Sequence, residues 1–212
     1  MQSKPYTTLA NLLEISEEKN SPNRQGLALV MRHAPRTPLQ TINDVYEADL
    51  TREGRQAAQE FGAALRNRFT LRGLFSSPIR RCIHTAEALR EGYQADIPLY
   101  SFWWLFSPFL APQSYSFDST LIHKQKIDIF SRQGIEEKAL SSMDKQRLNI
   151  ILNRIKIPSL PNELILYITH DSTVAPLYAL LYGEDTVYVE DYPDYLEGIL
   201  FTKINGQVVK IP

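Results

Sequence analysis

Short apolar runs of strand length alternate with segments of helical periodicity along much of this chain. The runs at Leu27–Met31 and Glu163–Thr169 are mostly apolar, as expected of strands buried in the centre of a sheet. Ala58, Phe61 and Leu65 instead lie on one stripe at helical spacing. This alternation predicts an α/β fold, a three-layer sandwich with a mainly parallel central sheet and an antiparallel edge. The predicted strands are Leu27–Met31, Leu71–Ser76, Ile97–Tyr100, Glu163–Thr169, Gly198–Ile204 and Gln207–Ile211. The predicted helices are one that Thr51 caps and that ends at Arg66, a second over Ile79–Arg90 and a third over Thr173–Tyr182.

The alternation stops between Ser101 and Pro161. An aromatic cluster, Phe102–Phe109, is followed by two predicted helices at about Ser119–Gln133 and Ile135–Ile155. We expect most of these aromatic rings to anchor the segment on the core, leaving one or two to face a pocket. A chain of 212 residues suits one domain with an insertion, so we predict a single domain over residues 1–212 with a small inserted segment at about 101–161.

Composition excludes several classes of protein. Lys and Arg total 23 and Asp and Glu total 24, so no overall charge recruits nucleic acid or an anionic membrane. The apolar runs are far too short to span a bilayer, and residues 1–25 contain no apolar core of signal-peptide length. We therefore predict a cytoplasmic protein with no nucleic-acid partner and no membrane span.

Thiol and imidazole side chains are too few and too scattered to form a metal site. Cys82 is the single cysteine, which excludes an intramolecular disulfide, and its helical surroundings predict a small buried residue. The chain has 4 histidines, of which His123 has no acid or thiol at ligand spacing and His84 is expected in a surface or helix-packing role. The sequence therefore predicts no bound metal.

The most specific pattern follows the first predicted strand and reads Arg32-His33-Ala34-Pro35-Arg36. Two guanidinium groups beside an imidazole disfavour ring protonation, so His33 should stay neutral and nucleophilic. The planar donor forks of Arg32 and Arg36 match the charged oxygens of a phosphoryl group. We interpret the segment as a phosphate pocket with a nucleophile in its floor, and a strand end with scattered surface charges is the alternative.

A second segment, Ser76–Ala86, follows the strand Leu71–Ser76. Ser77 and Pro78 suit the N-cap and the first position of a helix. Arg81 and Thr85 are four residues apart and therefore share one helix face. Arg80 points elsewhere and is expected to be an exposed charge.

A third segment places His170 and Asp171 directly after the strand Glu163–Thr169. On its own this pair is weak evidence, because Asp171 could simply cap the next helix. Ligand sites in open α/β sheets form at the carboxyl ends of strands, however, and all three segments occupy such ends. The three segments are therefore expected to meet in one phosphate site.

These segments together resemble the histidine phosphatase superfamily, in the branch that contains acid phosphatases and phytases. The first is similar to the R-H-G-x-R-x-P signature, with Ala34 where that family usually has glycine. Ser76–Ala86 resembles the helix start that carries a phosphate-binding arginine, and His170-Asp171 resembles the family's His-Asp pair. Glu197 lies in a stretch that resembles one following the His-Asp helix in related proteins, and we interpret it as structural.

The resemblance implies a phosphomonoester hydrolase that forms a phosphohistidine intermediate and needs no cofactor. It also implies that the insertion at about 101–161 is a helical cap carrying substrate specificity, and that the partner is a small phosphomonoester. The residues so assigned are His33 as nucleophile, Asp171 as general acid, and Arg32, Arg36, Arg81 and His170 as the phosphate-binding groups.

Two other functions stay open. A phosphotransferase or mutase of the same superfamily would use the same phosphohistidine, although that branch carries its acid elsewhere and lacks the His-Asp pair. A non-catalytic phospholigand-binding module would keep the arginines but would not need both His33 and Asp171. Turnover of an aryl phosphate separates the catalytic from the non-catalytic class.

Overall fold

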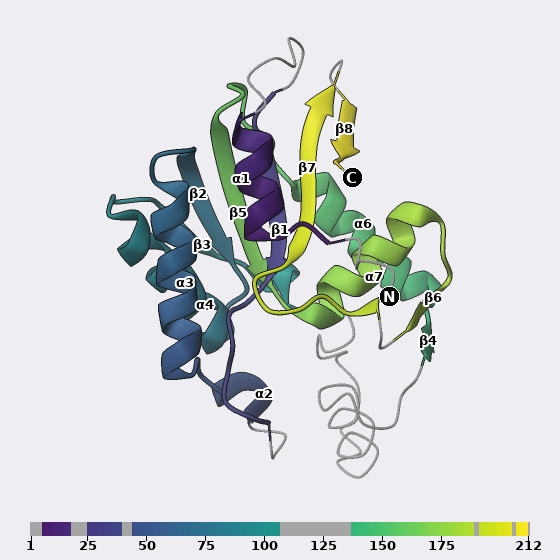
Figure 1. The fold of residues 1–212 in the computed structure, drawn as a ribbon. Helices are drawn as coiled ribbons and strands as arrows, with labels where there is room; N and C mark the ends of the chain where they lie inside the picture. Colours follow the sequence, from purple (N-terminus) through teal and green to yellow (C-terminus); the bar gives the residue numbers. More distant parts are fainter. Residues whose placement is uncertain are drawn as a thin grey trace.

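A six-stranded sheet forms the centre of the protein, with strand order β3-β2-β5-β1-β7-β8 (Figure 1). The computed structural model describes residues 6–17, 25–39, 44–106, 137–188, 191–204 and 207–211. The first four strands in this order are parallel, and the last two add an antiparallel edge, so the predicted sheet is confirmed. The strands are β1 (Leu27–Arg32), β2 (Thr70–Ser76), β3 (Leu99–Ser101), β5 (Glu163–Thr169), β7 (Gly198–Ile204) and β8 (Gln207–Lys210).

Helices cover both faces of this sheet, which gives the predicted three layers (Figure 1). Leu29 of β1 belongs to one buried core cluster and Val30 belongs to the other. Because successive side chains of a strand point to opposite faces, β1 must be apolar at every position to fill both clusters. The first face carries α1 (Leu9–Glu17), α3 (Arg52–Leu65) and α4 (Arg80–Tyr93), and the second carries α6 (Ser142–Arg154) and α7 (Asp171–Tyr182).

Smaller elements lie around this frame. They are α2 (Asp44–Glu47), the 3-10 helix η1 (Trp103–Leu105) and a two-stranded antiparallel sheet of β4 (Glu137–Ala139) and β6 (Thr186–Tyr188). None of the helices that the structure describes is both long and apolar enough to cross a membrane.

The helix predicted over Ile135–Ile155 is wrong at its start. Residues 137–139 form β4 instead, and α6 begins at Ser142 because Ser141 and Asp144 form a reciprocal capping box. Leu148 and Ile151 of α6 lie in the same core cluster as Val30, so α6 belongs to the layer that covers the sheet. A cap over residues 101–161 stays a prediction. Three predicted features lie outside the described residues: residues 107–109 of the aromatic cluster, the helix Ser119–Gln133 and His123.

Candidate active site

The carboxyl ends of β1, β2 and β5 bring the three predicted segments to one edge of the sheet (Figure 1). The hydrogen-bond ladder continues one residue past each strand. The backbone N–H of His33 donates to the Thr169 carbonyl at 2.9 Å, and that of Ser77 donates to the Ile168 carbonyl at 2.9 Å. This register places the residues that follow β1 and β2 on either side of His170.

Arg81 joins the two histidines of the site. Its Nε donates to Nε2 of His33 at 3.1 Å, and its Nη2 lies 3.1 Å from Nδ1 of His170. Its Nη1 donates to the Val45 carbonyl at 2.7 Å, so all three nitrogens of this buried guanidinium are engaged. The imidazole rings of His33 and His170 meet edge to face, with centroids 5.6 Å apart. Arg81 is therefore the centre of the cluster.

The tautomer of His33 follows from its two partners. Nδ1 lies 2.8 Å from the Ala34 carbonyl, which can only accept, so Nδ1 carries the proton. Nε2 accepts from Arg81, a group that can only donate, so Nε2 presents a lone pair. Burial lowers the pKa of His33 well below its usual value, and the nearby Arg81, His170 and Arg32 lower it further. The structure therefore agrees with the prediction of a neutral ring.

His170 is held by groups that differ from those around His33. Its Nε2 lies 3.0 Å from the Ser77 hydroxyl, and the Phe106 ring meets its imidazole edge to face at 5.6 Å. Burial lowers the pKa of His170 as well, with Arg81 as the next largest cause. Both ring nitrogens are thus engaged within the protein, and direct contact of His170 with phosphate stays a prediction.

Ser77 has a role that the sequence did not suggest. The residue preceding α4 in the capping position is Ile79, which makes no side-chain cap, so the prediction that Ser77 caps this helix is wrong. The Ser77 hydroxyl accepts from the Ile79 backbone N–H at 3.4 Å and also contacts His170. Cys82 contacts the same ring, with Sγ 3.6 Å from Nε2 of His170, and burial raises the pKa of its thiol to about 12. This agrees with the predicted small buried residue.

Acid should destabilise the protein through the two histidines. Each has a pKa below 6.5 when folded, so under mildly acidic conditions only the unfolded chain takes up their protons. The free energy of unfolding should then fall as the pH drops below about 6.5, by up to about 1.4 kcal/mol per pH unit for each histidine. Urea unfolding between about pH 7.5 and pH 5 measures this slope.

The His33→Ala variant is the control for that slope, because it removes one of the two sites. The free energy of unfolding of this variant should change less steeply with pH than that of the wild type. The difference in slope should correspond to about one proton fewer taken up on unfolding. Equal slopes for the two proteins would contradict a neutral buried His33.

Asp171 and Arg32 form an ion pair at the edge of the site. Nη2 of Arg32 lies 2.8 Å from Oδ2 of Asp171, whose other oxygen accepts from the Ser172 backbone N–H at 2.7 Å. Helix α7 begins at Asp171, with His170 in the capping position. The direction of the carboxylate is therefore fixed. The Asp171 side chain is partly exposed, whereas that of Arg32 is buried.

Arg36 belongs to the same cluster of charges but lies further out. It is half-buried, and its Nη1 donates to the Thr37 carbonyl at 2.9 Å. Burial lowers its pKa, whereas the nearby Tyr195 and Asp171 raise it. The six predicted residues are thus brought together, with three arginines around one carboxylate.

The backbone after His33 is pressed against the first turn of α3. A Cβ on Gly54 would lie 2.0 Å from the Pro35 carbonyl oxygen, so glycine is required for this contact. The Ala34 N–H donates to the Thr85 hydroxyl at 3.0 Å, which confirms that Thr85 faces the site with Arg81. Ala34 is buried and has no positive φ, so its methyl group is accommodated where the family's signature has glycine.

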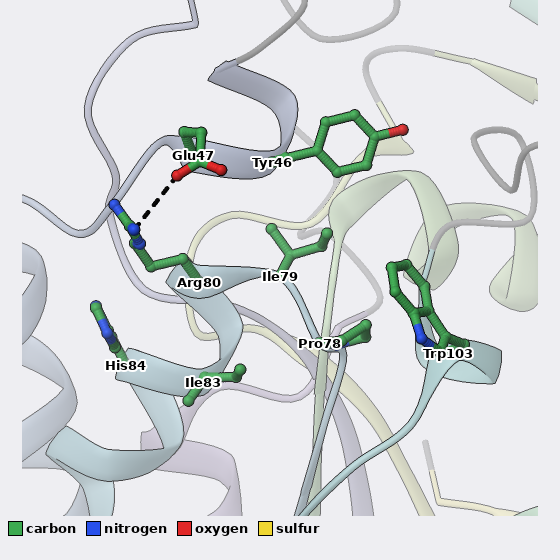
Figure 2. Close-up of a pocket in the computed structure, with 8 residues that line it drawn as sticks. All are labelled: Tyr46, Glu47, Pro78, Ile79, Arg80, Ile83, His84 and Trp103. Atoms are coloured by element: carbon green, nitrogen blue, oxygen red, sulfur yellow. Dashed lines mark ion pairs between the residues drawn. The ribbon is translucent and has the colours of Figure 1, made fainter.

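A groove lies between α2, the start of α4 and η1 (Figure 2). Phe106 contacts two residues of its lining, Tyr46 and Trp103, and also contacts the imidazole of His170. Arg80 pairs with Glu47 at 3.3 Å, as expected of an exposed charge. The groove has a volume of about 380 Å³ and is lined by Tyr46, Glu47, Pro78, Ile79, Arg80, Ile83, His84 and Trp103, so none of the six predicted residues lines it.

Nδ1 of His84 lies 2.5 Å from Oδ1 of Asp49, in agreement with the predicted surface role. Glu197 accepts from the Asp194 backbone N–H at 2.9 Å, in agreement with a structural role. Within the part of the chain that the structure describes, no group of three or more His, Cys, Asp or Glu residues is placed to hold a metal ion.

One model of a known protein family matches the part of the chain that contains the first two segments of this site. The family model described as the histidine phosphatase superfamily (branch 1) matches residues 29–100. Over these residues the chain is similar to branch 1 of that superfamily. The matched range contains Arg32, His33, Arg36 and Arg81 and ends before His170, so the branch of acid phosphatases and phytases is not confirmed. No curated protein matches the chain.

Solved structures show the same fold over nearly the whole chain. Bacillus stearothermophilus YhfR is 20% identical with a TM-score of 0.55, covering 87% of this chain and 95% of its own. Phosphoglycerate mutase from Bacillus anthracis is 13% identical with a TM-score of 0.56, covering 91% and 94%. Phosphoserine phosphatase from Entamoeba histolytica is 16% identical with a TM-score of 0.55, covering 88% and 95%. The chain has the α/β fold of these proteins.

Proposed function

We propose that this protein is a phosphomonoester hydrolase in which His33 is the nucleophile. The observation that carries the proposal is the fixed tautomer of His33, whose Nε2 lone pair faces the buried guanidinium of Arg81. A neutral imidazole among arginines is a nucleophile placed where phosphate oxygens would bind.

The reaction would run in two steps. In the first, the N–H of Arg81 Nε turns from His33 to a phosphate oxygen, and the lone pair so released on Nε2 of His33 forms a bond to phosphorus. The bond from phosphorus to the leaving oxygen breaks, and Asp171 gives its proton to that oxygen. In the second, water attacks the phosphohistidine, Asp171 takes a proton from the water, and inorganic phosphate leaves with His33 restored. Arg32, Arg36 and Arg81 would balance the charge on the phosphate oxygens in both steps.

Release of inorganic phosphate from phenyl phosphate tests the proposal. Steady turnover with one phosphate released per phenol identifies a hydrolase. Transfer of the phosphoryl group to an added alcohol or sugar in place of water would identify the transferase or mutase alternative. Phosphate binding without any turnover would identify the non-catalytic module and refute the proposal.

A finer assignment to the acid phosphatase-like type rests on His170 and Asp171. They are adjacent at the end of β5, and Asp171 points its carboxylate at Arg32. The mutase alternative is kept because B. anthracis phosphoglycerate mutase has the same fold. The His-Asp pair favours the hydrolase.

Catalysis should need no metal ion. Arginine side chains would supply the positive charge that Mg²⁺ or Zn²⁺ supplies in other phosphoryl-transfer enzymes. Dialysis against a strong chelator should therefore leave the rate of phenyl phosphate hydrolysis unchanged. Loss of activity on chelation, with recovery on adding a metal ion, would contradict this prediction.

Substrate preference should favour small or partly apolar phosphomonoesters. Arginines bind the phosphate of all monoesters similarly, so discrimination depends on contacts with the rest of the substrate. Phe106 reaches the site through its contact with His170, which agrees with one ring of the aromatic cluster facing it. Specificity constants for phosphotyrosine, a sugar phosphate, a nucleoside monophosphate and inositol hexakisphosphate test this. A clear preference for the last would contradict it.

A further inference from the structure

Tyr195 contacts two of the proposed catalytic groups although its sequence position gives no sign of it. Its ring covers the face of the Arg32 guanidinium, with Cζ 3.9 Å from the ring centroid. The same ring lies beside the imidazole of His33, with centroids 5.7 Å apart. Stacking of a guanidinium on an aromatic face is a favourable cation–π contact.

The turn Asp194–Glu197 fixes the position of this ring. The Glu197 N–H donates to the Asp194 carbonyl at 3.2 Å, and the Glu197 side chain accepts from the Asp194 N–H at 2.9 Å. Leu196 has a φ of 63°, a left-handed conformation that a branched residue adopts only where its surroundings impose it. The Arg32 N–H donates to the Glu197 carbonyl at 2.9 Å, which joins the turn directly to the end of β1.

Arg32 itself is held on its edges as well as on its face. Nη1 donates to the Pro193 carbonyl at 2.8 Å, and Nη2 pairs with Asp171 at 2.8 Å. Nε is buried and makes no hydrogen bond among the described residues. A stacked ring occupies none of these edge donors.

We propose that Tyr195 is a positioning residue for Arg32, an inference that rests on the proposed function. During the first step Asp171 must hold and then release a proton, so its ion pair with Arg32 changes through the cycle. The cation–π contact does not depend on the protonation of Asp171. Tyr195 thus keeps the guanidinium plane aligned with the phosphate whenever the ion pair is weakened.

The test compares the variants Tyr195→Leu and Tyr195→Phe. Leucine keeps apolar bulk but removes the ring, whereas phenylalanine keeps the ring and removes only the hydroxyl. Tyr195→Leu loses the cation–π contact with Arg32, so inhibition by inorganic phosphate should weaken about tenfold in this variant. Its kcat/KM for phenyl phosphate should fall by at least the same factor. Tyr195→Phe should stay within about twofold of the wild type in both measurements.

Tyr182→Leu is the matched control. It removes a ring that lies 4.2 Å from Nζ of Lys210, a contact of the same type at the opposite end of α7 from Asp171. This variant should leave phosphate inhibition unchanged. The thermal unfolding midpoint, measured for all three variants, separates a loss of positioning from a loss of stability.

Binding of inorganic phosphate to each protein, measured by calorimetry, separates failure of this inference from failure of the proposed function. A wild type that binds phosphate without turnover refutes the hydrolase, and weaker binding by Tyr195→Leu alone would still support positioning. Unchanged binding in folded Tyr195→Leu, or equal losses in Tyr195→Leu and Tyr195→Phe, would overturn the inference. A wild type that does not bind phosphate would overturn both.

Discussion

Replacing His33 with alanine is expected to abolish phosphomonoester turnover while the protein stays folded. The imidazole of His33 is the proposed nucleophile in the first step. Among the described residues, no other neutral nucleophile contacts Nε of Arg81, so none could take its place. Loss of a covalent nucleophile commonly costs several orders of magnitude, so kcat should fall at least about a thousandfold. Steady-state hydrolysis of phenyl phosphate measures the loss.

Rapid-quench labelling with a radioactive phosphomonoester should detect the intermediate directly. The wild type should acquire an acid-labile label, and His33→Ala should acquire none. His84→Ala is the matched control, because His84 lies on the surface in contact with Asp49 and should leave both measurements unchanged. Substantial turnover by a folded His33→Ala protein would rule out the covalent mechanism.

The sequence predicts the layers of the fold because both faces of the central strands are covered. Leu29 and Val30 enter opposite core clusters, and this leaves an uninterrupted apolar run that periodicity detects. The cap of α4 was predicted wrongly at a residue whose side chain also has a partner far along the chain. Ser77 resembles a helix cap, yet its hydroxyl contacts His170, which is 93 residues away. Local patterns contain no information about such a partner.

The three segments of the candidate site could be predicted because each follows the carboxyl end of a strand, where parallel strands bring ligand groups together. The arrangement of these side chains relative to one another could not be predicted from the sequence. The bridge from Arg81 to His33 and His170 depends on the register of β2 against β5. Tyr195 was missed because the turn after it returns the chain to Arg32, a contact between residues 32 and 195 that no short motif encodes.

The arrangement also bears on how a protein with a formal net charge of −1 would bind a phosphate dianion under the proposed function. Arg32, Arg36 and Arg81 face one carboxylate, so positive charge is concentrated at the sheet edge rather than over the whole surface. Burial strengthens this field because little water screens Arg32 and Arg81. Burial is the main cause of the low pKa of His33, and the same field lowers that pKa further, so the proposed phosphate binding and nucleophilicity share part of their physical cause.

Replacing Asp171 with asparagine is expected to slow hydrolysis by an amount that depends on the leaving group. An alkyl oxygen is a poor leaving group and needs the proton, so turnover of an alkyl phosphate should fall by about a hundred- to ten-thousandfold. An activated aryl phosphate, whose leaving group departs without a proton, should lose much less. The ratio of kcat for the two substrates is the measurement.

Comparing two substrates removes the other effects of this substitution. Asparagine keeps the size of the side chain and the acceptor for the Ser172 N–H, but it loses the ion pair with Arg32. That loss changes the charge around the phosphate in the same way for every monoester, so it lowers or raises both rates together. Only proton donation distinguishes the alkyl from the aryl leaving group. Equal losses for the two substrates would therefore show that Asp171 orients Arg32 and does not act as the general acid.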